Sequence, residues 1–327
     1  MYPGIRTDLI GVSSLVYLRQ VCYDMPIFFG FKTARLMEYT KVTWEGYEGC
    51  YRCAVGTAEL IIATGFGPRI LSLTTDGTEN ILFVDAEETL GHGDWRLYGG
   101  HRLWIAPEMN DTYVPDNEPC IVEEGEDFLS VSSRDERLGL KKTLTILDEN
   151  GLIRIDHTIL NESDTLVTGG IWALTCVNNI GTAFFPWGTK GSWDLKKVVY
   201  WRRWMDHTSE IGDNQFKPTD DLFLVTPTGR EGKVGSACWE GFIGVTAPGF
   251  TFIKMFNRLP VNSYPDDNCA AECYTGPHFT ELETLSPLVT FFPGEPITHS
   301  EHWLVASHSV DPTDGDKVRE FIAHMKG

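Results

Sequence analysis

Two glutamates in the segment FTELETLSP, residues 279–287, carry the clearest potential chemistry in the chain. If the segment is a strand, Glu281 and Glu283 point to the same face, about 7 Å apart. Two carboxylates on one face can act as acid and base, or can bind hydroxyl groups. Phe279 and Leu285 share that face and make it partly apolar. The alternative is a solvated charged face of an antiparallel strand.

A second segment, WRLYGGHRLWIAPEMN at residues 95–110, places two Trp, two Arg, a His and a Glu around a Gly-Gly pair. The glycines allow a tight turn or a close approach to a ligand. Aromatic faces stack on sugar rings, and Arg and Glu hydrogen-bond hydroxyl groups. The polar candidates are His101, Arg102 and Glu108. The alternative is a loop whose aromatic side chains close one end of the fold, with Arg and Glu paired.

Three further polar residues occur in apolar surroundings. His299 and Glu301 share a strand face with Trp303, where a mutually satisfied polar pair is favoured over a catalytic one. His157 lies on a face of isoleucines and is interpreted as a core histidine. Lys254, in FIKMF, lies between two phenylalanines on one face, so it either extends to solvent or reaches an anionic ligand.

The elements that must position these residues are mostly strands. Apolar residues alternate with polar ones along 152–160, the period of a half-buried strand. Turns such as DENG, TAPG and FPGEP separate the segments. Strands are predicted at 60–64, 70–74, 128–132, 140–147, 152–160, 166–177, 198–201, 222–225, 241–246, 252–257, 279–285, 288–292 and 297–305.

The C-terminus is the one clearly helical segment, because Val318, Phe321, Ile322 and Met325 recur with helical spacing. Asp314 or Asp316 can cap it. So many strands without an evident linker predict an all-β fold, a large antiparallel two-sheet sandwich that forms a single domain over 37–327 with a C-terminal helix.

Composition limits the partners. The 327 residues are 42% hydrophobic and 22% charged, as in an ordinary globular protein, with a formal net charge of -19. Such a surface repels phosphate backbones, so we expect neither a nucleic-acid partner nor an anionic membrane partner. The spacing of the eight Cys does not match a structural zinc site. We therefore expect reduced thiols, no metal, no cofactor and a cytoplasmic location; the sequence leaves the oligomeric state open.

Residues 1–36 differ in pattern from the rest of the chain, and strand-like sequence starts directly after Met37. The apolar run 9–18 is too short for a membrane helix. It also lacks the basic start and the small-residue cleavage site of a signal peptide. We interpret 1–36 as an N-terminal extension that either lies outside the native protein or is poorly structured.

An ordered set of motifs resembles the galactose mutarotase-like, or aldose 1-epimerase-like, proteins. GPRILSL from Gly67 and NILF from Asn80 resemble their opening strands. RLYGGHRLWIAPE resembles a segment of the hexose-phosphate mutarotase branch. IWALT, ELETLSPL and FFPGEPITHSEHW follow in the family's order, so that the resemblance covers roughly residues 45–305. It is closest to an uncharacterised bacterial family of mutarotase-like domains with a GGHRLW-type motif.

The resemblance implies an antiparallel β-supersandwich with a sugar site on a concave face. Family enzymes use a Glu in an L-E-T-type strand as base, which Glu283 matches, and an Arg near the glycine pair, which Arg96 or Arg102 matches. Their acid is a His, but GGIWALT, the matching segment here, has none. His101 or His157 would have to replace it.

Together these observations favour a carbohydrate-binding protein of this fold, with a small sugar or an oligosaccharide as ligand. An aldose epimerase is the alternative, and a polysaccharide lyase remnant is a weaker one. The expected catalytic residues are Glu283 and His101. The expected ligand-binding residues are Arg96, Arg102, Glu108, Trp172, Lys254 and Glu281.

Overall fold

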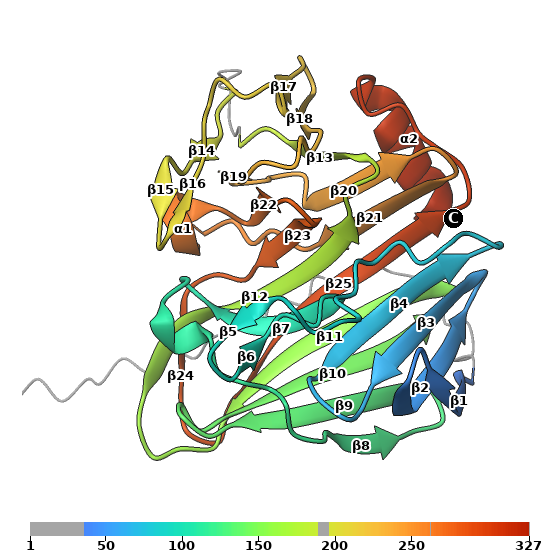
Figure 1. The fold of residues 1–327 in the computed structure, drawn as a ribbon, viewed down its shortest axis with the longest axis vertical. Coiled ribbons are helices and arrows are strands. Elements are labelled where there is room, and N and C mark those ends of the chain that lie inside the picture. The colour runs from blue at the N-terminus through green and yellow to red at the C-terminus, as the bar shows by residue number, and fades with distance from the viewer. Residues whose placement is uncertain (1–35, 189–195, 262, 327) are drawn as a thin grey trace, which may run out of the picture. The chain divides into compact units, whose positions relative to one another are not determined.

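The computed structural model describes residues 36–188, 196–261 and 263–326, and its ribbon consists mainly of two large β-sheets (Figure 1). The predicted extension therefore lies outside the described residues except for Leu36. Ala34–Gly327 form one compact unit. Every pairing between named strands in the described part of the chain is antiparallel, as the sequence predicted.

The first sheet is 11-stranded, in the order β1 (Glu38–Trp44), β2 (Tyr47–Val55), β3 (Ala58–Ala63), β4 (Arg69–Thr75), β7 (His101–Ala106), β12 (Val167–Asn178), β23 (Phe279–Leu285), β22 (Ala271–Thr275), β19 (Gly232–Ser236) and β14 (Val199–Tyr200), with β24 (Val289–Phe291) paired to β12. Its central strands therefore come from distant parts of the sequence.

The second sheet is 10-stranded, in the order β17 (Phe216–Pro218), β18 (Leu222–Val225), β13 (Thr182–Pro186), β20 (Phe242–Ala247), β21 (Phe250–Phe256), β25 (Pro296–Ala306), β11 (Leu152–Asn161), β10 (Leu140–Glu149), β9 (Phe128–Asp135) and β8 (Ile121–Glu124). Two hairpins, β5 (Gly91–His92) with β6 (Trp95–Arg96) and β15 (Arg203–Trp204) with β16 (His207–Thr208), lie outside both sheets. Short helical turns occur at η1 (Asn110–Thr112) and α1 (Pro265–Asn268).

Each predicted strand corresponds to a strand of the structure, and the alternation in 152–160 appears as alternating burial along β11. The sequence did not predict β7: its GGHRLWIA stretch was interpreted as a candidate binding segment around a glycine pair, with a loop as the alternative, and no strand was assigned to it. Gly99 and Gly100 have positive φ angles of 81° and 68°. A Cβ there would lie 2.3 Å from the Phe83 carbonyl oxygen and 2.2 Å from that of Ile70. Only glycine allows the chain to enter β7 so closely.

Between the sheets lies an ion pair that belongs to the core. The Lys254 ammonium, on β21, lies 3.0 Å from a Glu301 carboxylate oxygen on β25, and both side chains are fully buried. Lys254 also donates to the carbonyl oxygens of Ala173 and Leu282, at 3.0 and 2.9 Å. Because those carbonyls belong to β12 and β23, one side chain of the second sheet ties together two strands of the first.

A chain of buried histidines lies beside this ion pair. The His157 Nδ1 lies 2.9 Å from the carbonyl oxygen of His299, which can only accept, so this nitrogen carries the hydrogen. Burial lowers the pKa of His157 and of His101, which keeps both imidazoles neutral. Because the one hydrogen of neutral His157 is on Nδ1, its Nε2 accepts from the His101 Nε2, 2.7 Å away. The His101 Nδ1 then accepts from the Thr175 hydroxyl at 2.9 Å.

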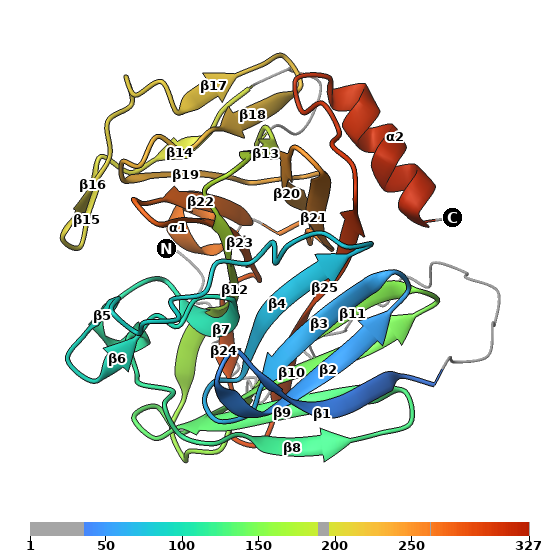
Figure 2. The ribbon, with the colours of Figure 1, turned by 45° about the vertical axis from the view of Figure 1, so that its right-hand side comes forward.

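The C-terminal helix α2 (Gly315–Lys326) packs on the outside of the second sheet, near β20 and β21 (Figure 2). Val318 and Phe321 join an apolar cluster with Phe242, Ile253 and Leu304. The Asp314 carboxylate accepts from the backbone N–H of Lys317 at 3.2 Å, which confirms Asp314 as the capping residue.

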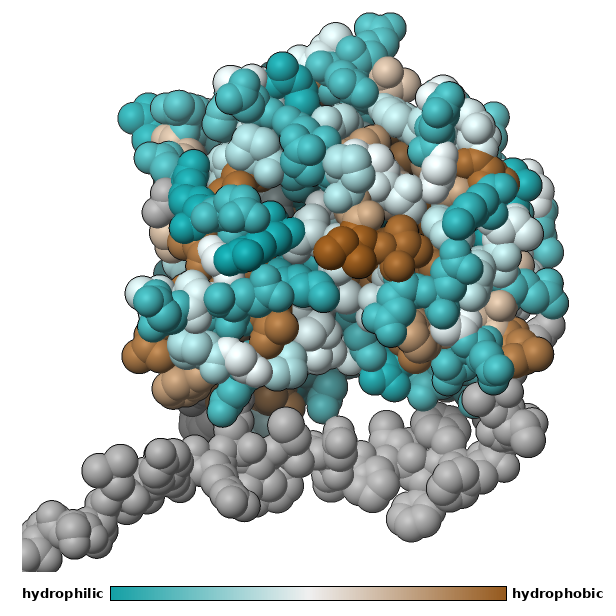
Figure 3. Space-filling model, turned by 90° about the horizontal axis from the view of Figure 1, so that it is seen from below, coloured by the Kyte–Doolittle hydropathy of each residue, from teal (hydrophilic) through white to brown (hydrophobic). Residues whose placement is uncertain are grey.

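One face, seen from below, is mostly hydrophilic with separate apolar groups (Figure 3). No helix in the described ranges has the length and apolar character that crossing a bilayer requires.

Candidate functional site

Five neighbouring strands, β7, β12, β23, β22 and β19, carry polar and aromatic side chains on the face of the first sheet that points away from the second. We call this the outer face. The register places Glu283 between Leu174 of β12 and Glu272 of β22, so all three side chains point the same way. Lys233 pairs with Tyr274 on the next strand and extends the row.

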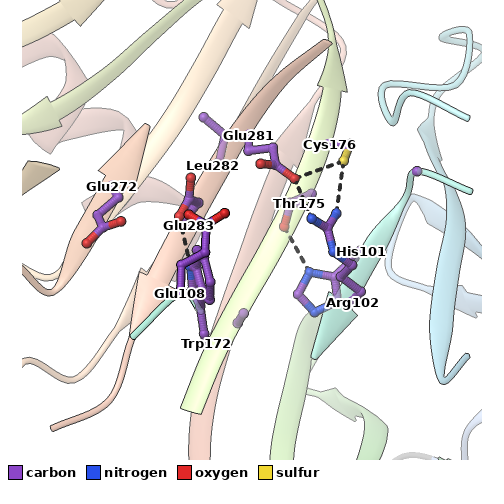
Figure 4. Close-up of polar contacts among 12 residues, drawn as sticks. His101, Arg102, Glu108, Trp172, Thr175, Cys176, Glu272, Glu281, Leu282 and Glu283 are labelled. Atoms are coloured by element: carbon purple, nitrogen blue, oxygen red, sulfur yellow. Dashed lines mark hydrogen bonds and ion pairs between the residues drawn. The ribbon is translucent and has the colours of Figure 1, made fainter. Parts of the chain in front are cut away.

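The centre of the outer face is a group that we call the Lys233 cluster, formed by Lys233, Glu108, Glu272, Glu283 and Trp172. The Lys233 ammonium lies 2.9 Å from a carboxylate oxygen of Glu272, 3.3 Å from Glu283 and 3.9 Å from Glu108. It also lies 4.8 Å from the centre of the Trp172 ring. Three carboxyl groups thus surround one ammonium over an aromatic face. Figure 4 shows the side chains of Glu108, Glu272, Glu283 and Trp172.

Glu283 is fully buried at the base of this cluster. One carboxylate oxygen accepts from the Trp172 indole N–H at 2.8 Å, while the other has no hydrogen-bond donor among the described residues. Burial raises the pKa of Glu283 to about 7, with Glu281 and Glu108 adding to the rise and Lys233 opposing it. The carboxyl group therefore titrates near neutral pH.

Glu272 is equally buried, and apart from the Lys233 ammonium neither of its carboxyl oxygens has an N–H or O–H donor in the described chain. Burial raises its pKa well above the ordinary value, and Glu283 adds to that rise. Burial raises the pKa of Asp266 as well, with Lys233 opposing the rise and Glu108 adding to it. Burial therefore raises the pKa of several carboxyl groups that lie near the single Lys233 ammonium.

A second ion pair lies beside the cluster. The Arg102 guanidinium donates to a Glu281 carboxylate oxygen at 2.8 Å, and to the Cys176 sulfur at 3.3 Å (Figure 4). It also lies 4.3 Å from the Trp104 ring centre. Glu281 is thus neutralised by its own arginine, whereas the carboxyl groups around Lys233 share a single cation.

The structure brings five of the sequence-predicted residues to the outer face: Arg102, Glu108, Trp172, Glu281 and Glu283. It does not bring His101 and Lys254 there. His101 precedes Arg102 on β7, and successive strand residues point to opposite faces, so His101 faces the sheet interior. Its expected role as acid partner of Glu283 does not agree with this placement. Lys254 is engaged by Glu301 instead of an anionic ligand.

Arg96 is also separate from the cluster. It lies on β6 and donates to the carbonyl oxygens of Gly93 and Trp95, within its own hairpin. Of the two arginines that the family resemblance left open, Arg102 is therefore the one that contacts the outer-face carboxylates.

Sequence reasoning missed Lys233 and Glu272. Each lies on a strand of only five residues, and neither strand was predicted. The available signal was a single charged residue in a run of small and apolar ones, GKVGSAC and CAAECY. Such a charge is expensive to bury unless it has a partner, so both segments indicated paired, buried groups.

One group of buried side chains has a spacing that could hold a metal ion. His101, His157 and Glu301 offer ligand atoms within 4.8 Å of one another, a spacing that a metal ion can use. The two imidazoles, however, bond each other, and the Lys254 ammonium holds the carboxylate. A dication would have to displace both interactions beside an existing positive charge. The group fits a closed hydrogen-bond network better than a metal site.

Comparison with solved structures supports the fold. The chain is similar to a galactose mutarotase-like protein from Lactobacillus casei, with TM-score 0.53 and 8% identity over 79% of this chain and 100% of that one. A galactose mutarotase related enzyme from Lactobacillus acidophilus gives TM-score 0.53 and 10% identity, covering 80% and 98%. No family model and no curated protein sequence matches the chain.

A TPR-domain containing protein from Parabacteroides distasonis gives TM-score 0.55 and 14% identity over 80% of this chain. The match spans 48% of that protein, about half of its length. The chain therefore has the galactose mutarotase-like fold, a large antiparallel β-sandwich, here with a C-terminal helix. The identities are too low for these neighbours to show more than the fold.

Proposed function

We propose that the chain binds a carbohydrate on the outer face of the first sheet, at the Lys233 cluster. The observation that carries the proposal is a set of buried carboxyl oxygens, on Glu272 and Glu283, without hydrogen-bond donors in the described chain. An unpaired buried acceptor costs free energy, and sugar hydroxyl groups are donors that can pair with it. The cluster approaches the surface at Glu108, whose side chain is 15% exposed.

The aromatic side chains support the same ligand class. Trp172 and Trp104 contact each other edge-on, with ring centres 5.8 Å apart, and Tyr113 contacts Trp104. Rings of this kind provide apolar faces next to the polar groups, which is the combination that a sugar ring needs. The described galactose mutarotase neighbours add the expectation that comes with the fold.

The test is to titrate the protein with a panel of free mono- and oligosaccharides and to measure binding by calorimetry and by protein NMR. We expect saturable binding of at least one sugar, weakened by Trp172→Phe, which removes the indole donor to Glu283. Glu295→Gln, a change at an exposed turn residue, is the matched control and should leave affinity unchanged. Absence of binding to every sugar up to millimolar concentration would contradict the proposal.

A second candidate function is that of an aldose epimerase in which Glu283 is the base. One specific observation favours it: the pKa of Glu283 lies near 7, the range in which a carboxylate removes a proton most effectively at neutral pH. Ionised Glu283 would take the proton of the anomeric hydroxyl as the sugar ring opens.

Anomer exchange, followed by polarimetry or NMR across an aldose panel, tests this candidate. We expect Glu283→Gln to lower turnover by at least ~100-fold, the usual contribution of a general base, while the fold is retained because the change is nearly isosteric. If the wild type does not exceed the buffer rate for any aldose, carbohydrate binding without catalysis is the function that remains.

A further inference from the structure

We propose that the sugar bound on the outer face carries a protonated amine, which contacts the carboxyl groups of the Lys233 cluster, and that the same face disfavours sugars with a phosphate or carboxylate group. This inference rests on the proposed carbohydrate binding and names the chemical class of the sugar. Its basis is the balance of charges on the outer face and the carboxyl oxygens that existing contacts leave unpaired.

Carboxyl groups outnumber the cations that contact them in the described part of the outer face. The Lys233 ammonium lies 2.9–3.9 Å from carboxylate oxygens of three residues, Glu108, Glu272 and Glu283. The Arg102 guanidinium contacts a fourth carboxylate, that of Glu281, at 2.8 Å. Four carboxyl groups therefore share two cations, and a ligand that brings another positive charge reduces the repulsion among them.

These contacts leave two buried carboxyl oxygens without a partner. The Oε1 atoms of Glu272 and Glu283 have no hydrogen-bond donor among the described residues, and both side chains are fully buried. Lys233 contacts the other oxygen, Oε2, of each carboxyl group. Glu272 and Glu283 are direct partners across β22 and β23, which places their Cβ atoms ~5 Å apart. Because one ammonium already contacts both carboxyl groups, an ammonium on the ligand can do the same from the side of the Oε1 atoms.

A protonated amine matches these oxygens better than a hydroxyl group does. A hydroxyl supplies one donor and no charge, whereas an ammonium supplies three donors and a positive charge. Hydrogen bonds between ionised partners are roughly twice as strong as those between neutral ones. Burial raises the pKa of Glu272 and of Glu283 in the free protein, and Lys233 opposes the rise. A second ammonium acts in the same direction as Lys233, and so favours the ionised carboxylates that bind it most tightly.

An anionic sugar lacks a matching partner in this arrangement. A phosphate or carboxylate group loses its hydration on binding and needs a cation to offset that cost. Lys233 and Arg102, the cations in contact with the outer-face carboxyl groups, each already have a carboxylate oxygen within 2.9 Å. The net charge of -19 adds a repulsion of longer range. A sugar phosphate should therefore bind more weakly than the sugar without its phosphate.

Glu108 is the carboxylate at which this preference can be tested without disturbing the core. Its side chain is 15% exposed, whereas those of Glu272 and Glu283 are fully buried. At 3.9 Å it also makes the longest of the three contacts with Lys233. One Glu108 oxygen accepts from the Tyr113 hydroxyl, an interaction that a glutamine side-chain oxygen can keep. Glu108→Gln therefore removes a charge and little else.

The test is a calorimetric titration of the wild-type protein with a hexose, its amino derivatives, the matching acetamido derivatives and its phosphate ester. We expect at least one amino sugar to bind ~10-fold or more tightly than the parent hexose, as charge-assisted hydrogen bonds predict. The acetamido sugar keeps the nitrogen without the charge and should lose this gain. The phosphate ester should bind more weakly than the parent hexose.

The variants locate the preference. Glu108→Gln should reduce the gain from the amine by about threefold, the effect of one partly exposed charge, with little change for the parent hexose. Glu295→Gln removes the same charge at an exposed turn and should keep the full gain.

Three results would overturn the inference while leaving carbohydrate binding intact. They are an amino sugar that binds no more tightly than its parent hexose, a phosphate ester that binds more tightly, and an equal loss of the gain in Glu295→Gln and Glu108→Gln. If neither the neutral, the amino nor the phosphorylated sugars bind, the proposed carbohydrate function itself is wrong.

Discussion

Glu283 is a residue whose protonated form the folded protein prefers. Its pKa is raised from 4.5 to about 7, so between these pH values the folded state binds more protons than the unfolded state. The free energy of unfolding must then fall as pH rises through this window. Glu283→Gln cannot titrate, so the variant should gain stability relative to wild type from pH 4.5 to 7. Urea unfolding of both proteins across this range measures the difference; a constant difference would contradict the assigned shift.

The buried ion pair of Lys254 and Glu301 gives a second prediction at the level of single residues, about the stability of the protein. Its removal in Lys254→Met would leave the Glu301 carboxylate buried without its ammonium partner. Breaking a buried ion pair on one side typically costs about 3–5 kcal/mol. The double variant Lys254→Met/Glu301→Gln should recover part of that loss, because no isolated charge remains. Lys217→Met, at an exposed position, is the control. Equal stability of the single and double variants in urea unfolding would show that the pair is not coupled.

For single residues, the sequence predicted which residue types belong to the candidate site more easily than the face of the sheet on which each side chain lies. The period of two placed Glu281 and Glu283 on one face, and the structure has them so. The same rule separates His101 from Arg102, but it was not applied because no strand was predicted for their segment. Lys233 and Glu272 could not be found from spacing, since their contacts join strands that are distant in sequence.

The strands of the two sheets differ in how clearly their hydrophobic period shows in the sequence. Strands β10 and β11 alternate between buried and half-buried residues, so their period is visible in the sequence. Strands β12, β19, β22 and β23 are buried on both faces, which removes the alternation. The strands that position the candidate site are therefore the ones that carry the weakest pattern.

Helix α2 provides a prediction at the level of an element. Phe321 and Val318 are its buried residues in the apolar cluster on the second sheet, which includes Phe242 and Leu304. Phe321→Ala should lower the free energy of unfolding by about 3 kcal/mol, at the lower end for a buried Phe because the site is peripheral. Glu320→Ala, on the exposed side of the same helix, should change it by less than about 0.5 kcal/mol. A Phe321→Ala protein as stable as the control would mean that α2 does not brace the sheet.

For the whole molecule, the net charge and the pattern of strands give information about different properties: the charge about binding partners, and the strands about the fold. A net charge of -19 does not select a fold, but it opposes the approach of anionic polymers. The sandwich was predictable because many strands without a linker leave few ways to bury one apolar face. The order of strands was not, since it depends on pairings between distant segments such as β12 and β23. These pairings also bring Arg102 and Glu281, 179 positions apart, into contact.

The central position of β12 has a consequence for synthesis. One of its edges is completed by β23, which begins roughly 100 residues after β12 ends. At about 5–20 residues per second, a ribosome needs on the order of 5–20 s to add that stretch. During this interval the middle of the future sheet has an open hydrogen-bonding edge. Until β23 has been synthesised, this edge of β12 is therefore the part of the sheet most open to pairing with another chain.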